Sequence, residues 1–112
     1  MKVYLPIRTW SEANARVHWG KRARRARKQR DAARMLVRMA GADVEGLGTI
    51  MVTLTRIAPR DLDSDNLSSA LKAVRDGIAD ALGLDDGDPR LDWHYAQHAG
   101  TPGEYSVLVE IQ

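Results

Sequence analysis

Short segments of alternating hydrophobic and polar residues predict four β-strands, because successive side chains of a strand point to opposite faces of a sheet. These segments are residues 3–7, 49–57, 91–98 and 105–111. Pro6 lies in the first of them and lacks the backbone N–H that a central strand must donate, so we expect this strand at an edge of the sheet.

Two other segments carry apolar residues at helical spacing. The first runs without proline or glycine from about Lys21 to Ala40 and is basic and amphipathic. The second runs from about residue 66 to 82, where we expect Asp65 to cap its start and Gly83 to end it. A continuous helix of that length would span roughly 25 Å.

The order strand-helix-strand-helix-strand-strand predicts an α+β fold, in which a small mixed β-sheet is covered by two helices. A chain of 112 residues is the length of one domain, residues 1–112, and no internal repeat or linker divides it. It has no cysteine and no apolar stretch of the roughly 18 residues that a membrane span needs. We therefore expect neither membrane insertion nor secretion, and a cytoplasmic location.

The formal net charge of +2 conceals two blocks of opposite sign. Residues 16–38 contain ten Lys or Arg and one Asp, whereas residues 61–92 contain nine Asp against three basic residues. A basic surface attracts polyanions, and crowded carboxylates repel one another unless a cation neutralises them. The pattern favours a phosphate-rich ligand and a bound metal, and the alternative is that the two blocks neutralise each other across the fold.

The basic helix is the predicted DNA-binding surface, because guanidinium groups bind phosphate oxygens in a bidentate manner. A solvated helix face is the competing interpretation. The residues proposed to contact DNA are Arg22, Arg24, Arg25, Arg27, Lys28 and Arg30.

Three carboxylates, from Asp61, Asp63 and Asp65, stand at alternate positions in a segment expected to be extended, where they would project to a common side. The same spacing begins an EF-hand calcium loop, but the twelfth position of that loop needs a Glu and is Lys72 here, which excludes it. A magnesium or manganese centre remains, with Asp86 or its neighbour Asp85 as a further ligand.

Each piece of this pattern also has an ordinary structural interpretation. Asp65 alone could be an N-cap, residues 85–88 a polar turn, and Lys72 one half of an i, i+4 ion pair with Asp76. The functional interpretation depends on the pieces taken together.

Taken together, they resemble the RusA endodeoxyribonucleases, the Holliday junction resolvases of bacteria and their prophages. The resemblance is carried by Asp63-Ser64-Asp65-Asn66-Leu67, by Lys72-Ala73-Val74-Arg75-Asp76-Gly77-Ile78 and by Leu82-Gly83-Leu84-Asp85-Asp86-Gly87-Asp88. It is specific over residues 61–88 and looser elsewhere, where Leu5-Pro6 and the polar loop at residues 11–14 also match. Lys72 follows Asp65 by seven residues, whereas the best-known member of the family has four, as though nearly one helical turn had been inserted.

The resemblance implies a homodimeric, magnesium-dependent enzyme that cuts four-way DNA junctions, with Mn²⁺ as a possible substitute for Mg²⁺. Carried over by motif, Asp63, Asp65 and Asp86 would be metal ligands, and Lys72 would assist at the scissile phosphate. A continuous helix would separate Asp65 from Asp86, so the second carboxylate must arrive either by a loop that folds back or from a two-fold partner. Two alternatives of other kinds remain, namely a non-catalytic phage DNA-binding module and a nuclease acting on other branched DNA.

Overall fold

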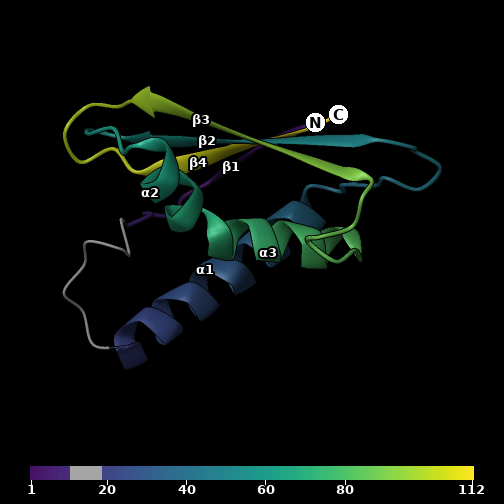
Figure 1. Ribbon diagram of the computed structural model, residues 1–112, viewed down its shortest axis with the longest axis horizontal. Helices are drawn as coiled ribbons and strands as arrows, with labels where there is room; N and C mark the ends of the chain where they lie inside the picture. Colours follow the sequence, from purple (N-terminus) through teal and green to yellow (C-terminus); the bar gives the residue numbers. More distant parts are fainter. Residues whose placement is uncertain (11–18) are drawn as a thin grey trace.

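The computed structural model describes residues 1–10 and 19–112 and has the predicted α+β architecture. A four-stranded mixed sheet is formed by β1 (Lys2–Leu5), β2 (Ile50–Ala58), β3 (Leu91–Ala99) and β4 (Ser106–Ile111). The helices are α1 (Trp19–Met39), α2 (Ser64–Ala70) and α3 (Lys72–Leu82), and they lie on one face of the sheet (Figure 1). The family-like polar loop at residues 11–14 lies outside the described residues.

The order of strands in the sheet is β1-β4-β2-β3. β4 pairs antiparallel with both β1 and β2, while β2 and β3 are parallel, with Ile50 opposite Leu91. Parallel neighbours require a crossover connection, and α2 and α3 supply it. β1 is an edge strand and ends just before Pro6, as the proline predicted.

The core lies between the sheet and the helices because each element turns one apolar face inward. Alternate residues of β2 are buried, and α1 buries Gln29, Ala33 and Val37 at intervals of four residues. Ala26, three residues before Gln29, is instead exposed. The first turns of α1, up to Lys28, therefore carry no fully buried side chain.

The predicted second helix is divided at Leu71, which is both the C-cap of α2 and the N-cap of α3. Its backbone φ and ψ are −96° and 0°, and its side chain is fully buried. The apolar residues Leu67, Leu71, Val74 and Ile78 continue on one face through this break and pack into the same core. The prediction of one continuous helix is therefore wrong, although its buried face is as predicted.

α1 and α3 pack closely because a glycine lies at their contact. A Cβ built at Gly77 would meet the backbone oxygen of Arg30 and would lie 2.8 Å from Cβ of Ala33. Arg30 also forms a two-point ion pair with Asp80 of α3, with Nε 2.6 Å from Oδ2 and Nη2 3.0 Å from Oδ1. The basic and acidic blocks thus meet at this interface.

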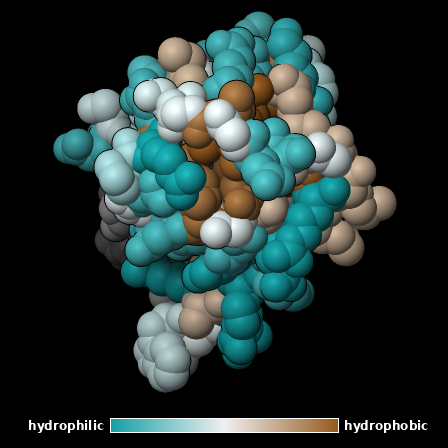
Figure 2. Space-filling model, turned by 90° about the vertical axis from the view of Figure 1, so that its right-hand side faces the viewer, coloured by the Kyte–Doolittle hydropathy of each residue, from teal (hydrophilic) through white to brown (hydrophobic). Residues whose placement is uncertain are grey.

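The end of the molecule that carries the α1–β2 and α3–β3 loops is shown in Figure 2, where apolar atoms are visible between hydrophilic ones. A hollow of about 360 Å³ at this end is lined by residues 42–46, residues 81, 82 and 84, and Arg90. Among residues 1–10 and 19–112, no helix has the length and apolar character needed to cross a membrane.

Candidate functional site

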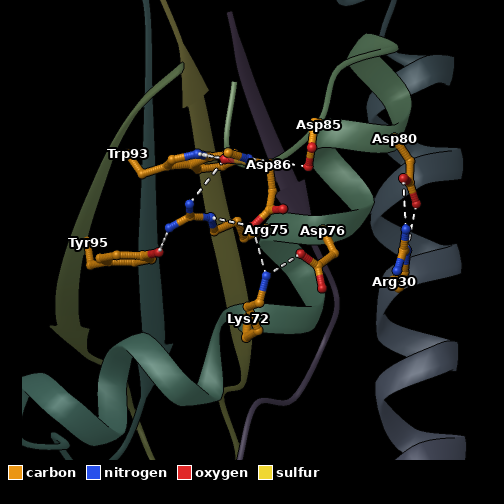
Figure 3. A network of polar contacts seen from close by, with 10 residues as sticks. Arg30, Lys72, Arg75, Asp76, Asp80, Asp85, Asp86, Trp93 and Tyr95 are labelled. Atoms are coloured by element: carbon orange, nitrogen blue, oxygen red, sulfur yellow. Dashed lines mark hydrogen bonds and ion pairs between the residues drawn. The ribbon is translucent and has the colours of Figure 1, made fainter. Parts of the chain in front are cut away.

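Lys72 lies at the centre of a polar cluster formed by α3 and the loop that follows it. Its ammonium nitrogen donates to Oδ1 of Asp76 at 2.7 Å and to Oδ2 of Asp86 at 2.8 Å (Figure 3). Asp76 is one helical turn further along α3, whereas Asp86 comes from the loop between α3 and β3. This loop folds back along α3 far enough for two of the four predicted catalytic side chains to touch in one chain.

The backbone of Asp86 is fixed by two neighbouring elements. Its carbonyl oxygen accepts from Nη2 of Arg75 on α3 at 3.1 Å and from Nε1 of Trp93 on β3 at 2.9 Å. The Arg75 guanidinium lies 4.7 Å from the centroid of the Trp93 ring and donates from Nη1 to the hydroxyl of Tyr95 at 2.9 Å. The position of the Asp86 carboxylate is therefore determined by packing between α3 and β3.

Opposite charges favour the ionised forms of Lys72 and Asp86. Hydrogen bonding to Asp76 and then to Asp86 raises the pKa of Lys72 above its usual value. The hydrogen bond from Lys72 lowers the pKa of Asp86, against the opposing effect of burial. The Arg75 guanidinium also approaches Asp86, with Nε 3.5 Å from Oδ2.

A polar hollow of about 210 Å³ opens beside the cluster. It is lined by Arg30, Lys72, Asp76, Ala79, Asp80, Leu84, Asp85 and Asp86. The Arg30 guanidinium lowers the pKa of Asp80 and occupies both of its oxygens, so this carboxylate is engaged in a structural ion pair.

Asp63 and Asp65 lie apart from this cluster, at the start of α2. Asp63 is the N-cap, and its carboxylate accepts from the backbone N–H of Asn66 at 2.9 Å and from the Asn66 side chain at 3.0 Å. Asp65 is exposed in the first helical turn. Asp63 rather than Asp65 therefore caps the helix, and the predicted extended arrangement of residues 61–65 is wrong because the cap starts the helix at Ser64.

The carboxylates assigned to the metal by resemblance are not gathered in one chain. Asp65 lies in α2, whereas Lys72 is the first residue of α3, seven positions later in the chain. The loop with Asp86 leaves the other end of α3 and folds back along that helix until the Asp86 carboxylate reaches Lys72. Within the described ranges 1–10 and 19–112, no group of three or more His, Asp or Glu side chains is arranged to hold a metal ion. Among residues 1–10 and 19–112 of one chain, Asp63, Asp65 and Asp86 are thus not grouped as a three-carboxylate magnesium site, although oxygen donors suit that ion.

The predicted DNA-binding residues fall into two groups. Arg24, Arg27 and Lys28 are exposed on the first turns of α1, as are Arg22 and, in part, Arg25. Arg25 also lies over the Trp10 ring, 4.6 Å from its centroid. Arg30 instead forms an ion pair with Asp80 at the contact between α1 and α3. At this point the basic and acidic blocks neutralise each other, as the alternative interpretation of the sequence expected.

The residues that hold Asp86 were not identified from the sequence. The Lys72–Asp76 pair was available from its i, i+4 spacing, and the structure contains it. Trp93 and Tyr95 stand two residues apart on β3, which places both on one face of the strand. This spacing could have indicated that both side chains contact a common neighbour, which is Arg75.

No protein-family model matches the chain. An uncharacterized protein of Xylella fastidiosa (strain Temecula1 / ATCC 700964) is 41% identical to it over 81 residues, which are 65% of this chain and 51% of that protein. The chain thus spans about half the length of this curated relative. Neither comparison bears on the resemblance to the RusA family.

Proposed function

We propose that the protein is a homodimeric, magnesium-dependent endodeoxyribonuclease of the cytoplasm that resolves four-way DNA junctions. The observation that carries this proposal is the contact of Lys72 with Asp86, 14 residues apart in the chain and 2.8 Å apart in space. The contact joins two of the three sequence segments on which the resemblance to the RusA family rests.

In this proposal Lys72 supplies positive charge to the phosphate that is cut. Hydrolysis of a phosphodiester accumulates negative charge on the phosphate oxygens, and a fixed cation beside them stabilises the transition state. Asp76 is a positioning residue, because its hydrogen bond orients the ammonium and keeps it protonated. With 57% of its side chain exposed, Lys72 can reach a strand placed over the hollow.

The metal ligands of the proposal are Asp63, Asp65 and Asp86, with Mn²⁺ as a substitute for Mg²⁺. Because one chain does not gather these three carboxylates, we assign completion of the ligand set to a second copy of the chain. A dimer also suits the substrate, since a four-way junction with two-fold symmetry requires two symmetric cuts.

The exposed basic turns of α1 are the proposed surface for the arms of the junction. Arg24, Arg27 and Lys28 are exposed, and these three form no ion pair within the described part of the chain. Exposed guanidinium and ammonium groups on one helix are suited to phosphate contacts that release counterions from DNA.

The test is the cleavage of synthetic four-way junctions by Asp65→Asn in the presence of Mg²⁺. We expect loss of cleavage with junction binding retained or tightened, because the variant removes a proposed ligand and also a charge that repels DNA. The matched control is Asp92→Asn, an exposed β3 carboxylate that pairs with His94, and it should cleave like the unmodified protein. Full cleavage by Asp65→Asn would exclude the metal assignment.

A non-catalytic DNA-binding module is the second candidate, favoured by the separation of Asp63 and Asp65 from Asp86 in a single chain. The same assay distinguishes the two functions. Junction binding without nicking at any Mg²⁺ or Mn²⁺ concentration would establish the module and reject the enzyme.

A further inference from the structure

Another hollow, of about 270 Å³, lies at the opposite end of β2 from Arg90. It forms where the chain leaves β1, where β2 ends and just before β4 begins. Its lining consists of Arg8, Thr9, Trp10, Arg56, Pro59, Arg60, Leu62 and Tyr105. Three of these residues are arginines and none is acidic.

The Arg8 guanidinium lies over two aromatic rings. Its guanidinium carbon lies 4.0 Å from the centroid of the Trp10 ring and 4.1 Å from that of Tyr105. An aromatic ring attracts the cation without accepting its N–H groups in conventional hydrogen bonds, so these groups can still donate to an acceptor. The aromatic residues thus orient Arg8 without neutralising its charge.

Arg56 is the buried member of the set, with 7% relative exposure. Its Nε donates to Oγ1 of Thr9 at 3.0 Å, and its Nη1 donates to the carbonyl oxygen of Arg60 at 2.6 Å. Burial lowers the pKa of Arg56, and the charge of nearby Asp61 acts in the opposite direction. Within the described ranges, neither Nη2 of Arg56 nor the side chain of Arg60 has a hydrogen-bond partner.

The arginines of this hollow have no ion-pair partner among residues 1–10 and 19–112. No Asp or Glu of the part of the chain that the structure describes forms an ion pair with Arg8, Arg56 or Arg60. Guanidinium groups without a carboxylate partner, one of them buried, favour an anion with several acceptor oxygens. The hollow has the volume of roughly nine waters at 30 Å³ each, so a phosphate group fits with solvent to spare.

We propose that this hollow binds a backbone phosphate of the DNA strand, through the N–H groups of Arg8, Arg56 and Arg60. The choice of DNA rests on the proposed function, and on the position of the hollow. Leu62 lines it and directly precedes Asp63, and the Gln97 side chain fixes Leu62 by bonds of 2.8 Å and 2.7 Å to its N–H and carbonyl. A phosphate held here lies next to the start of α2, which carries the proposed metal ligands.

Junction binding without divalent metal tests the hollow separately from cleavage. Binding of a fluorescent four-way junction is measured in EDTA over a series of salt concentrations, for Arg8→Gln, Arg60→Gln and the control Arg90→Gln. The control removes the same charge at the other end of β2, where Arg90 already pairs with Asp88. We expect each hollow variant to weaken binding several-fold and to reduce the logarithmic salt slope by about one unit, with no change for the control.

The outcomes test phosphate binding by the hollow separately from nuclease activity. The Arg60 side chain is exposed, so Arg60→Gln should not disturb the core. If this variant binds the junction with unchanged affinity and salt slope, the proposed phosphate site is wrong, even if cleavage is normal. If the hollow variants reduce the salt slope of junction binding but the unmodified protein never cleaves DNA, the phosphate site is supported and the nuclease activity is rejected. Stabilisation of the protein by inorganic phosphate, lost in Arg8→Gln, without any DNA binding would overturn the DNA assignment in favour of a small phosphate compound.

Discussion

At the scale of single residues, charge pairs connect the elements around the candidate site. Lys72 is shared between Asp76 and Asp86, and Arg30 is committed to Asp80. Each of these pairs joins side chains from different turns or elements, so each also fixes local structure. The chemistry proposed for Lys72 and Asp86 therefore uses groups that already stabilise the α3–β3 connection.

The lowered pKa of Asp86 predicts a loss of stability in acid. The stabilisation from this carboxylate is present above its usual pKa of 3.8 and is lost as the pH falls through its lower value in the folded protein. Asp86→Asn should lower the melting temperature at neutral pH and reduce the further drop in acid. Thermal unfolding from pH 7 to about pH 2 measures this.

The control for this prediction is Asp31→Asn, which removes an exposed carboxylate whose ion pair with Arg34 is 3.8 Å long. It should leave the acid dependence close to that of the unmodified protein. The same dependence in Asp86→Asn as in the unmodified protein would show that the Lys72–Asp86 pair contributes nothing to folding.

The positions of Asp63 and Asp65 show what residue types alone could not predict. Both residues favour helix N-caps, and the sequence leaves open which of them begins α2. The choice is made by Asn66, whose backbone and side-chain N–H groups both reach the Asp63 carboxylate. Such a local competition between caps is decided by geometry that the sequence does not display.

At the scale of the elements, apolar periodicity predicted the strands and the buried helix faces to within a few residues. It did not reveal the division at Leu71, because Leu67, Leu71 and Ile78 continue on one face through the break. Periodicity reports which side of a segment is buried and not whether its hydrogen bonding is continuous. The division places Asp65 in α2 and Lys72 in α3.

Gly77→Ala tests the close contact of α3 with α1. The added methyl group would overlap the Arg30 carbonyl oxygen and lie 2.8 Å from Cβ of Ala33, so the helices must move apart. We expect a loss of about 1 to 3 kcal/mol in the free energy of unfolding, as for other overpacked cores. Denaturant unfolding measures it, and Gly48→Ala, where no atom lies within 4 Å of the new Cβ, serves as the control.

The basic turns of α1 make a separate prediction about DNA. Changing Arg24, Arg27 and Lys28 together to Gln should weaken junction binding and flatten its salt dependence by up to three units, one for each lost phosphate contact. These side chains are exposed, so thermal stability should remain close to that of the unmodified protein. An unchanged salt slope would show that this helix does not contact DNA.

At the scale of the whole molecule, the order of the strands in the sheet could not be predicted from the sequence, because alternation of apolar and polar residues identifies a strand but not the strands with which it pairs. The crossover through α2 and α3 makes β2 and β3 parallel, which returns the chain along α3 and brings Asp86 within reach of Lys72. Asp63 and Asp65 belong to the start of α2, outside the polar cluster that joins Lys72, Asp76 and Asp86. We propose that a second chain completes a site that uses all of these residues.

Mixed dimers test this arrangement directly. If Asp65 of one chain works with Asp86 of its partner, a dimer of one Asp65→Asn chain and one Asp86→Asn chain contains one site with both changes and one site with neither. Mixing the two inactive variants should then restore nicking of a junction strand in Mg²⁺. The matched control mixes Asp65→Asn with Asp63→Asn, which leaves every site with one change and should stay inactive. With exchange of subunits verified by native mass spectrometry, an inactive first mixture would contradict a site shared between Asp65 of one chain and Asp86 of its partner.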